Sequence, residues 1–222
     1  MNDLPPGTAY RPHDLLWLAD ADALTVDGPY PAWATPPWLA VAPVVVRRAT
    51  LTDASRIPVG LRGATRSERC AAEVPARQVL RSRTPEDVAA AWLRRGAQGA
   101  FTTPCLQTLQ TLAPRLDALP LAWGVTGSVG FTLASGFDVL RHDSDLDLLV
   151  RAPSPADAAV LHRFAKLLGG HAARIDVQVE TPRGAFALQE WLRTGGPVLL
   201  KTSRGPLLSG DAWSPPERVL VA

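Results

Sequence analysis

The sequence feature that most constrains the fold is an alternation of aspartate and apolar residues. Asp145 and Asp147 alternate with Leu146, Leu148 and Val150, which is the period-two pattern of a strand with one buried face. Both carboxylates then share a face, with Cα atoms roughly 6.6 Å apart. Without a cation they would repel each other by on the order of a few kcal/mol. The pattern therefore predicts a strand whose paired aspartates bind a divalent metal.

Two other interpretations of this stretch compete with a catalytic metal pair. An isolated Asp-x-Asp is usually a solvated loop or a helix cap. Asp143 could also open a calcium-binding loop, but such a loop needs glycine at its sixth position and an acidic residue at its twelfth. Those positions hold Leu148 and Ser154. The sequence thus excludes the calcium loop and leaves the solvated turn as the alternative.

A small turn precedes the acidic strand. Gly127 and Ser128 follow the apolar run of residues 121–125, as at a change from strand to helix. Backbone N–H groups at such a turn point at an anion, and the helix dipole favours it. We therefore expect a phosphate-binding turn beside the metal pair.

A third carboxylate lies on another alternating strand. Ile175, Val177 and Val179 face one way, so Asp176 faces the other. If this strand lies beside the first, Asp176 can act as a metal ligand or as a general base for a hydroxyl group. In the alternative, it only pairs with a neighbouring arginine on an exposed face.

The chain is long enough for a large core and for two domains. It has 222 residues, of which 46% are hydrophobic and 20% charged. Residues 1–83 are rich in proline and tryptophan and predict a smaller, β-rich N-terminal domain, with strands at residues 39–47 and 57–63. Residues 84–222 predict an α/β (α+β) catalytic domain, in which a mixed β-sheet has flanking helices.

Start and stop signals place the helices of the second domain. Thr84 caps a helix that has Pro85 at its first position and Gly96 beyond its end. We expect further helices at residues 104–116, between Pro155 and Gly169, and at residues 185–193, and a last strand at residues 198–201.

Charge is distributed unevenly along the chain. The net charge of +2 does not indicate a broad nucleic-acid surface. Residues 47–83, however, hold nine arginines against Asp53, Glu68 and Glu73. Guanidinium groups bind phosphate and carboxylate bidentately, so this excess suits a polyphosphate or an acidic partner protein. The alternative is an arginine-rich codon bias without a ligand.

Neither end of the chain nor its apolar runs indicate a membrane protein. The first 18 residues lack a basic segment followed by an apolar one, and no run is long enough for a membrane span. We expect a cytoplasmic protein without membrane or nucleic-acid partners. Cys70 and Cys105 are isolated and predict free thiols.

The Gly127–Ser128 turn, Asp145-x-Asp147 and Asp176 together resemble the nucleotidyltransferase superfamily. Sixteen residues separate Ser128 from Asp145, more than that superfamily usually has. Over its length the chain resembles the holo-acyl-carrier-protein synthases of malonate decarboxylase, also called phosphoribosyl-dephospho-CoA transferases, in which this spacer is normal. The similar segments are residues 11–17, 57–63, 123–129, 143–153, 175–180 and 198–206.

The resemblance implies one reaction. The family takes 2′-(5″-triphosphoribosyl)-3′-dephospho-CoA and transfers its phosphoribosyl-dephospho-CoA part to a serine of the apo acyl-carrier subunit of malonate decarboxylase, releasing diphosphate. The nucleophile then belongs to the partner, so no catalytic serine or cysteine is expected in this chain.

The resemblance also implies roles for residues of this sequence. One or two Mg²⁺ ions would be held by Asp145, Asp147 and Asp176, and Asp176 would also take or orient the serine proton. The terminal phosphates would contact the Gly127–Ser128 turn, helped by Lys201. The CoA phosphates or the acidic carrier would contact Arg62, Arg66 and Arg69, for which surface solvation is the alternative.

His13 and Asp14 lie in a similar segment without an assigned role, and His13 is expected to be a packed residue capping the first strand. Two rival functions remain open. One is a nucleotidyltransferase that uses an ordinary nucleoside triphosphate on a small-molecule or protein hydroxyl. The other is an inactive module that binds only the carrier, against which the retention of three carboxylates argues.

Overall fold

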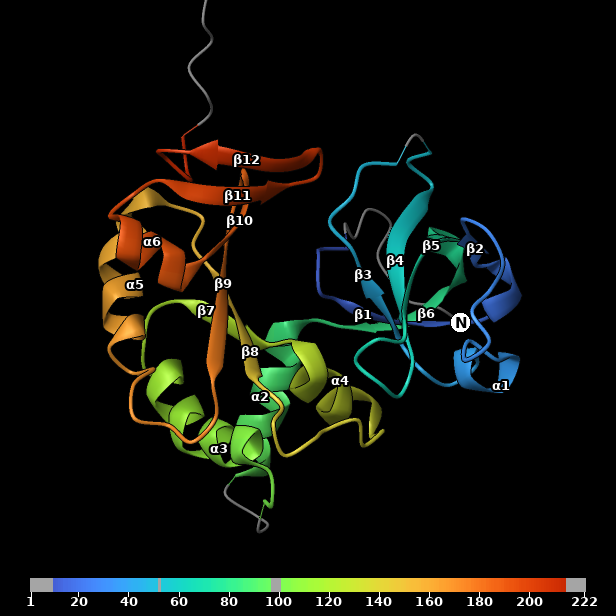
Figure 1. Cartoon of the computed structure of the whole chain (residues 1–222), viewed down its shortest axis with the longest axis horizontal. Helices are drawn as coiled ribbons and strands as arrows, with labels where there is room; N and C mark the ends of the chain where they lie inside the picture. The colour runs from blue at the N-terminus through green and yellow to red at the C-terminus, as the bar shows by residue number, and fades with distance from the viewer. Residues whose placement is uncertain (1–9, 52, 97–100, 215–222) are drawn as a thin grey trace, which may run out of the picture.

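The structure is a computed structural model that describes residues 10–51, 53–96 and 101–214. The expectation that the chain has no leader depends partly on residues 1–9, and these lie outside the described residues. The fold has two six-stranded sheets with helices around the second, which confirms the predicted α+β class. Figure 1 shows the first sheet in blue to green and the second from yellow-green to red.

The first sheet is antiparallel, with the strand order β2-β5-β4-β3-β1-β6. Its longest pair is β4–β5, in which Arg62 at the end of β4 lies opposite Arg69 at the start of β5. The elements are β1 (Leu15–Leu18), β2 (Thr25–Val26), α1 (Pro36–Leu39), β3 (Val44–Val46), β4 (Arg56–Arg62), β5 (Arg69–Pro75) and β6 (Val79–Arg83), with short 3₁₀ turns at Ala21–Ala23 and Ala76–Gln78.

The strand predicted at residues 57–63 is confirmed as β4, but the one predicted at residues 39–47 is too long. Only Val44–Val46 forms β3, and Leu39 ends helix α1. Proline explains both differences. Pro36 is pre-set for the first turn of a helix, and Pro43 has no N–H group to donate to a sheet.

The second sheet is mixed, as predicted, with the strand order β12-β11-β10-β9-β8-β7. Strands β8 and β9 are parallel and the other neighbours are antiparallel. The elements are α2 (Pro85–Arg95), α3 (Pro104–Asp117), β7 (Ala122–Val125), α4 (Gly127–Ser135), β8 (Leu146–Arg151), a 3₁₀ turn at Pro155–Asp157, α5 (Ala158–Ala165), β9 (Ile175–Thr181), β10 (Gly184–Ala187), α6 (Leu188–Thr194), β11 (Val198–Thr202) and β12 (Gly205–Ser209).

Helix α2 has the predicted cap: the Thr84 side chain accepts from the Asp87 N–H group and the Asp87 carboxylate accepts from the Thr84 N–H group. Two helix predictions were wrong at their boundaries. Helix α5 ends at Ala165. The chain then forms a tighter, 3₁₀-like turn, in which the Leu168 N–H group donates to the Ala165 carbonyl three residues back. Residues 185–187 belong to strand β10 instead of a helix, since a turn ending at Gly184 folds them antiparallel against β9.

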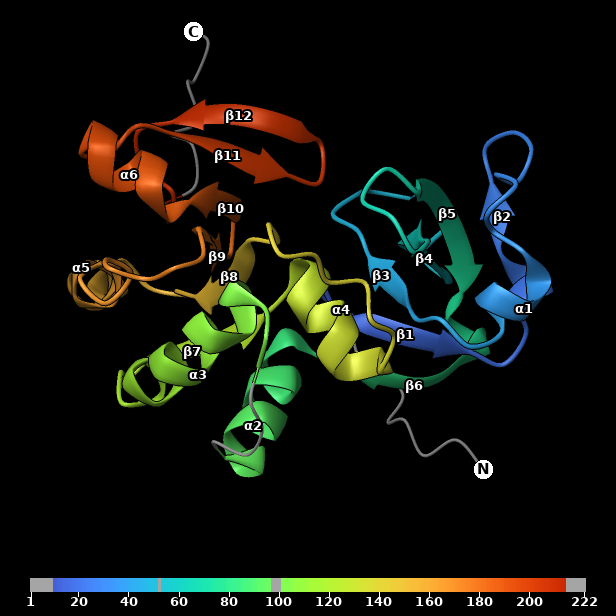
Figure 2. The same cartoon turned by 60° about the horizontal axis from the view of Figure 1, so that its bottom comes forward.

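The two faces of the second sheet differ. The apolar residues of β8 and β9, such as Leu148 and Val177, are buried in one core with side chains of α3 and α5. Helix α4 contributes Val129 to this core and lies between this sheet and the first in both views (Figures 1 and 2). An apolar cluster joins the sheets there, in which Leu15 and Trp17 of β1 meet Phe131 of α4. No helix among the described residues is long and apolar enough to cross a membrane.

Candidate active site

The parallel pairing of β8 and β9 places two predicted site residues side by side. Asp147 lies opposite Asp176 in the register, so their side chains share the face turned away from the buried core. This confirms that the two acidic strands are neighbours. Asp145 lies one residue before β8 begins, within two residues of Asp147.

The charge of these acids is incompletely balanced. Burial raises the pKa of Asp147 above its ordinary value, and the neighbouring negative charges of Asp176 and then Asp145 raise it further. Arg66 and Arg69 lower it and offset part of the effect. Ionised Asp147 is therefore held in a place that favours added positive charge.

The Gly-Ser turn lies directly against this carboxylate. Gly127 opens α4 with a φ of 62°, and a β-carbon there would overlap the Asp147 side chain. The turn is also tied to the strand, since the Thr126 N–H group donates to the Asp147 carbonyl at 2.9 Å. Glycine is needed both for its left-handed backbone and for the close approach. The predicted strand-to-helix turn is confirmed, and it touches the acidic pair.

Arg62 reaches this turn from the first sheet. Its Nη2 donates to Ser128 Oγ at 2.7 Å, and its guanidinium lies 5.1 Å from the centre of the Phe131 ring. The residue is only 8% exposed, so surface solvation was the wrong alternative for it. Burial lowers the pKa of Arg62 to about 10, an effect that Arg69 adds to and Asp147 opposes. Arg62 stays charged at neutral pH.

Two more arginines hold the other acids. Arg66 Nη2 lies 3.8 Å from Asp145 Oδ2, and Arg174 Nη2 donates to Asp176 Oδ1 at 3.1 Å. Asp176 thus does pair with a neighbouring arginine, as the alternative interpretation held, although it also lines a cavity. Both arginine side chains are largely exposed, at 80% and 71%, and free to exchange partners.

The three aspartates offer the hard oxygen atoms that Mg²⁺ prefers, and their mutual repulsion would be relieved by a cation. They do not form a ready-made cage. Within the described ranges, no group of three or more His, Cys, Asp or Glu side chains is arranged to hold a metal ion. The donor set fits magnesium chemically, and the predicted metal site itself stays a prediction.

A cavity of about 1100 Å³ lies between the two sheets at this point. Its lining includes most of the predicted site residues: Gly127, Asp147, Asp176, Arg62, Arg66, Arg69 and Lys201. Asp145 and Ser128 are outside the lining and touch it through Arg66 and Arg62. Both parts of the chain therefore line one cavity, to which they contribute acidic and basic side chains.

Comparison with known proteins identifies the family. Residues 11–85 match the phosphoribosyl-dephospho-CoA transferase MdcG N-terminal domain, and residues 92–212 match the phosphoribosyl-dephospho-CoA transferase MdcG C-terminal domain. The chain belongs to the phosphoribosyl-dephospho-CoA transferase family. The transferase is therefore an enzyme of the class expected from its sequence.

The relatives are similar over nearly their whole length. The phosphoribosyl-dephospho-CoA transferase of Pseudomonas putida (strain GB-1) is 44% identical over 95% of this chain and 98% of its own. That of Klebsiella pneumoniae is 45% identical over 91% and 96%. That of Azotobacter vinelandii is 43% identical over 91% and 94%. No solved structure matches the chain at a significant level.

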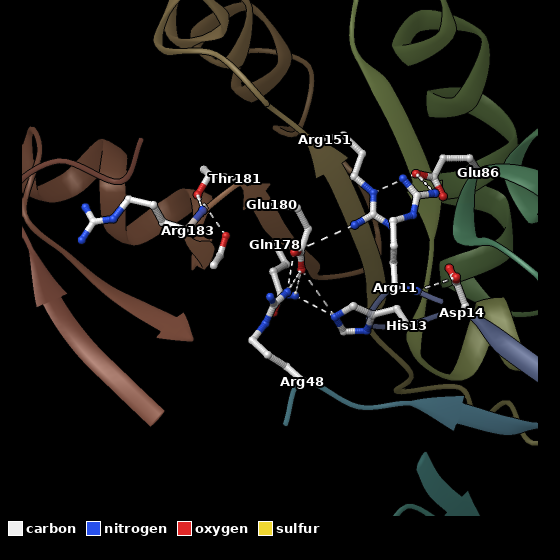
Figure 3. Close-up of polar contacts among 11 residues, drawn as sticks. Arg11, His13, Asp14, Arg48, Glu86, Arg151, Gln178, Glu180, Thr181 and Arg183 are labelled. Atoms are coloured by element: carbon white, nitrogen blue, oxygen red, sulfur yellow. Dashed lines mark hydrogen bonds and ion pairs between the residues drawn. The ribbon is translucent and has the colours of Figure 1, made fainter. Parts of the chain in front are cut away.

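Sequence reasoning missed a second polar cluster of the transferase, centred on Glu180 (Figure 3). Its carboxylate is only 7% exposed and receives hydrogen bonds on both oxygens from Arg48 and one from Gln178. Arg151 Nη1 lies 3.9 Å away. Glu180 continues the alternation that begins at Asp176, so the same pattern could have pointed to it.

His13 is packed just ahead of the first strand, and its N–H group donates to the carbonyl of Val46 in the neighbouring strand β3 at 2.9 Å. It lies two residues before β1, and its ring contacts β9, with Nε2 at 2.7 Å from the Gln178 amide nitrogen. Burial lowers the pKa of His13 to about 4, because it outweighs the opposing effect of Glu180. Asp14 closes the turn before β1 by accepting from the Arg11 N–H group at 2.9 Å.

Proposed function

We propose that this chain transfers the phosphoribosyl-dephospho-CoA group from 2′-(5″-triphosphoribosyl)-3′-dephospho-CoA to a serine of the apo acyl-carrier subunit of malonate decarboxylase, releasing diphosphate. The observation that carries the proposal is the parallel register that sets Asp147 opposite Asp176 at a cavity built by both sheets. Membership of the phosphoribosyl-dephospho-CoA transferase family supports triphosphoribosyl-dephospho-CoA as the donor.

The size of the cavity supports a large donor. Sites for small molecules usually measure about 300–1,000 Å³, and this cavity, at about 1100 Å³, lies above that range. A dephospho-CoA carrying a triphosphoribosyl group is much larger than a nucleoside triphosphate. We propose that residues 1–83 contribute the wall for the donor or the carrier and that residues 84–222 carry the chemistry.

The chain's own cations suit the triphosphate. Arg62 is held by Ser128 at the Gly127 turn, and its Nε has no hydrogen-bond partner among the described residues. A buried guanidinium with a free N–H group is a strong donor to a phosphate oxygen. With Arg66 and Arg69 on the same wall and backbone N–H groups at the start of α4, this part of the cavity would hold the phosphates that leave as diphosphate.

The carboxylates would serve the attacking and transferred groups. We propose that Asp176 accepts or orients the proton of the incoming serine, because it faces the cavity and is half exposed. Asp145, Asp147 and Asp176 would hold one or two Mg²⁺ ions, which when bound would neutralise charge on the phosphate oxygens. The cytoplasmic location and the absence of nucleic-acid and membrane partners stay predictions.

A reconstituted transfer tests this function. Purified protein is incubated with the apo carrier subunit and either the triphosphoribosyl precursor or ATP, and the carrier is weighed by mass spectrometry. We expect the carrier to gain one phosphoribosyl-dephospho-CoA group from the precursor, and no gain from ATP. Chelation with EDTA should stop the reaction, and Mg²⁺ should restore it. Labelling from ATP alone would contradict the proposal and favour an ordinary nucleotidyltransferase.

A further inference from the structure

His13 and Gln178 line the cavity, but neither residue has a role in the proposed transfer reaction. His13 holds a left-handed backbone, with a φ of 76°, which is uncommon for a residue other than glycine. The turn is fixed around it: the His13 N–H group donates to the Val46 carbonyl at 2.9 Å, and Asp14 closes the loop onto Arg11. The first sheet therefore presents the His13 ring rigidly to β9.

The ring constrains the Gln178 side chain. The amide nitrogen of Gln178 donates to Glu180 Oε1 at 2.8 Å and lies 2.7 Å from His13 Nε2. An amide nitrogen carries two hydrogens, so both are used if His13 Nε2 is an acceptor. The lowered pKa of His13 keeps its ring neutral, as an acceptor must be. Glu180 is itself fixed by Arg48.

With its nitrogen held in this way, Gln178 directs its carbonyl oxygen to Lys201. The Lys201 Nζ atom lies 3.5 Å from Gln178 Oε1, a long contact that orients an ammonium group without holding it tightly. Strand β11 supplies Lys201, so three elements meet at this amide: the segment before β1, β9 and β11.

Lys201 differs in its partner from three of the arginines that line the cavity. Arg48, Arg66 and Arg174 each form an ion pair with a carboxylate. In the part of the chain that the structure describes, no carboxylate forms an ion pair with Lys201. A neutral amide therefore orients this ammonium and leaves its full charge for an anion.

We propose that Gln178, held by His13 and Glu180, is a positioning residue that orients the Lys201 ammonium toward an anionic oxygen of a bound triphosphate. The inference rests on the proposed function for the identity of the donor, but only on cavity geometry for the binding of a triphosphate. Replacement of the amide by a carboxylate would keep the shape and neutralise the ammonium.

The test is a double-mutant cycle on the binding of inorganic tripolyphosphate to the full chain, measured by calorimetry. We expect Gln178→Met and Lys201→Met each to weaken binding about tenfold, and the double variant to bind no more weakly than the weaker single variant. Such non-additivity is the signature of a residue that acts through Lys201. A merely structural Gln178 would give a double variant weakened about a hundredfold.

Two further variants control for the effect of added charge and for the choice of substitution at Gln178. Gln178→Glu keeps the shape of the side chain but pairs the Lys201 ammonium with a carboxylate, and it should weaken binding at least as much as Gln178→Met. Gln189→Glu adds the same charge at another point of the cavity lining, and it should change the dissociation constant less than threefold, with or without Lys201. A dissociation constant within twofold of the original in both Gln178 variants would overturn the proposal. Because no transfer is measured, failure of the proposed reaction would leave this result unaffected.

Discussion

Asp176 and Glu180 lie on the same face of β9, four residues apart, in very different surroundings. The Asp176 side chain is 44% exposed and has one arginine, itself 71% exposed, while Asp147 adds negative charge beside it. The Glu180 side chain is 7% exposed and is contacted by Arg48, Arg151, Gln178 and His13. One strand thus carries an acid short of positive charge and an acid saturated with it.

The difference indicates separate tasks. A buried carboxylate that already has its full set of partners can join the two sheets but has no capacity left for a ligand. Carboxylates that repel each other at a cavity wall gain most from a bound cation. The comparison therefore predicts that substitutions at the Asp176 end abolish chemistry, whereas those at the Glu180 end reduce stability.

The largest effect is expected for Asp147→Asn, and a similar one for Asp145→Asn. Transfer to the carrier should fall at least about 10³-fold, because each variant removes a carboxylate that we propose binds the metal. Stability to urea at pH 7 should be unchanged or higher for Asp147→Asn, since the raised pKa means that the fold disfavours the ionised group. Full transfer activity in either variant would refute the metal assignment.

Asp176→Asn should lower turnover about 10²-fold, as expected for loss of a proton acceptor. Binding of the triphosphoribosyl donor should remain within about threefold, because the arginines that we propose contact its phosphates, Arg62, Arg66 and Arg69, are unchanged. Steady-state kinetics combined with calorimetric binding separates the two quantities. Unchanged turnover would remove Asp176 from the site.

Glu180→Gln should lower the free energy of unfolding by roughly 2–4 kcal/mol, because the buried Glu180 carboxylate loses its charge and the partly buried Arg48 and Arg151 lose an ion-pair partner. The matched control is Glu73→Gln, which breaks the Arg56 pair of a side chain that is 42% exposed and should cost less than about 1 kcal/mol. Equal losses in urea denaturation would show that the Glu180 cluster is no more than another surface pair.

The smallest expected effect is a loss of folding stability when the pH is lowered. The pKa of His13 is lowered from 6.5 to about 4 in the fold, so the unfolded chain binds the proton first as pH falls, and stability is lost between those values. Glu180, Arg48, Arg151 and Lys201 are the charged groups around it. Because a third of the side chain is exposed, we expect on the order of 1 kcal/mol between pH 7 and 5.

His13→Asn is the variant that isolates this contribution, because asparagine tolerates the left-handed backbone but does not titrate. Its urea midpoint should fall less on acidification than that of the unchanged protein. Parallel pH curves for the two proteins would contradict the assignment.

Local features of the site could be predicted from the sequence, and long-range ones could not. The alternation around Asp147 and Asp176, the Gly127 turn and the capped helix at Thr84 each depend on a few neighbouring residues, and the structure has them where expected. Strand β10 was missed because its partner β9 decides its conformation, not its own periodicity.

The residues that meet at the cavity could not be predicted from the sequence, for the same reason. Arg62 touches Ser128 across 66 positions of sequence, and His13 touches Gln178 across 165. Neither contact leaves a periodic or compositional signal. The burial of Arg62 and the neutral ring of His13 follow from the way the two sheets pack.

The parallel neighbours β8 and β9 also have a consequence for the order of folding. Antiparallel strands can pair across a tight turn, but a parallel pair must wait for a crossover, here the stretch that contains α5. Contacts between distant segments form slowly because loop closure is costly in entropy. Asp147 and Asp176 therefore meet only after this crossover has closed, and the pairing of β8 with its antiparallel neighbour β7 cannot by itself bring the two carboxylates together.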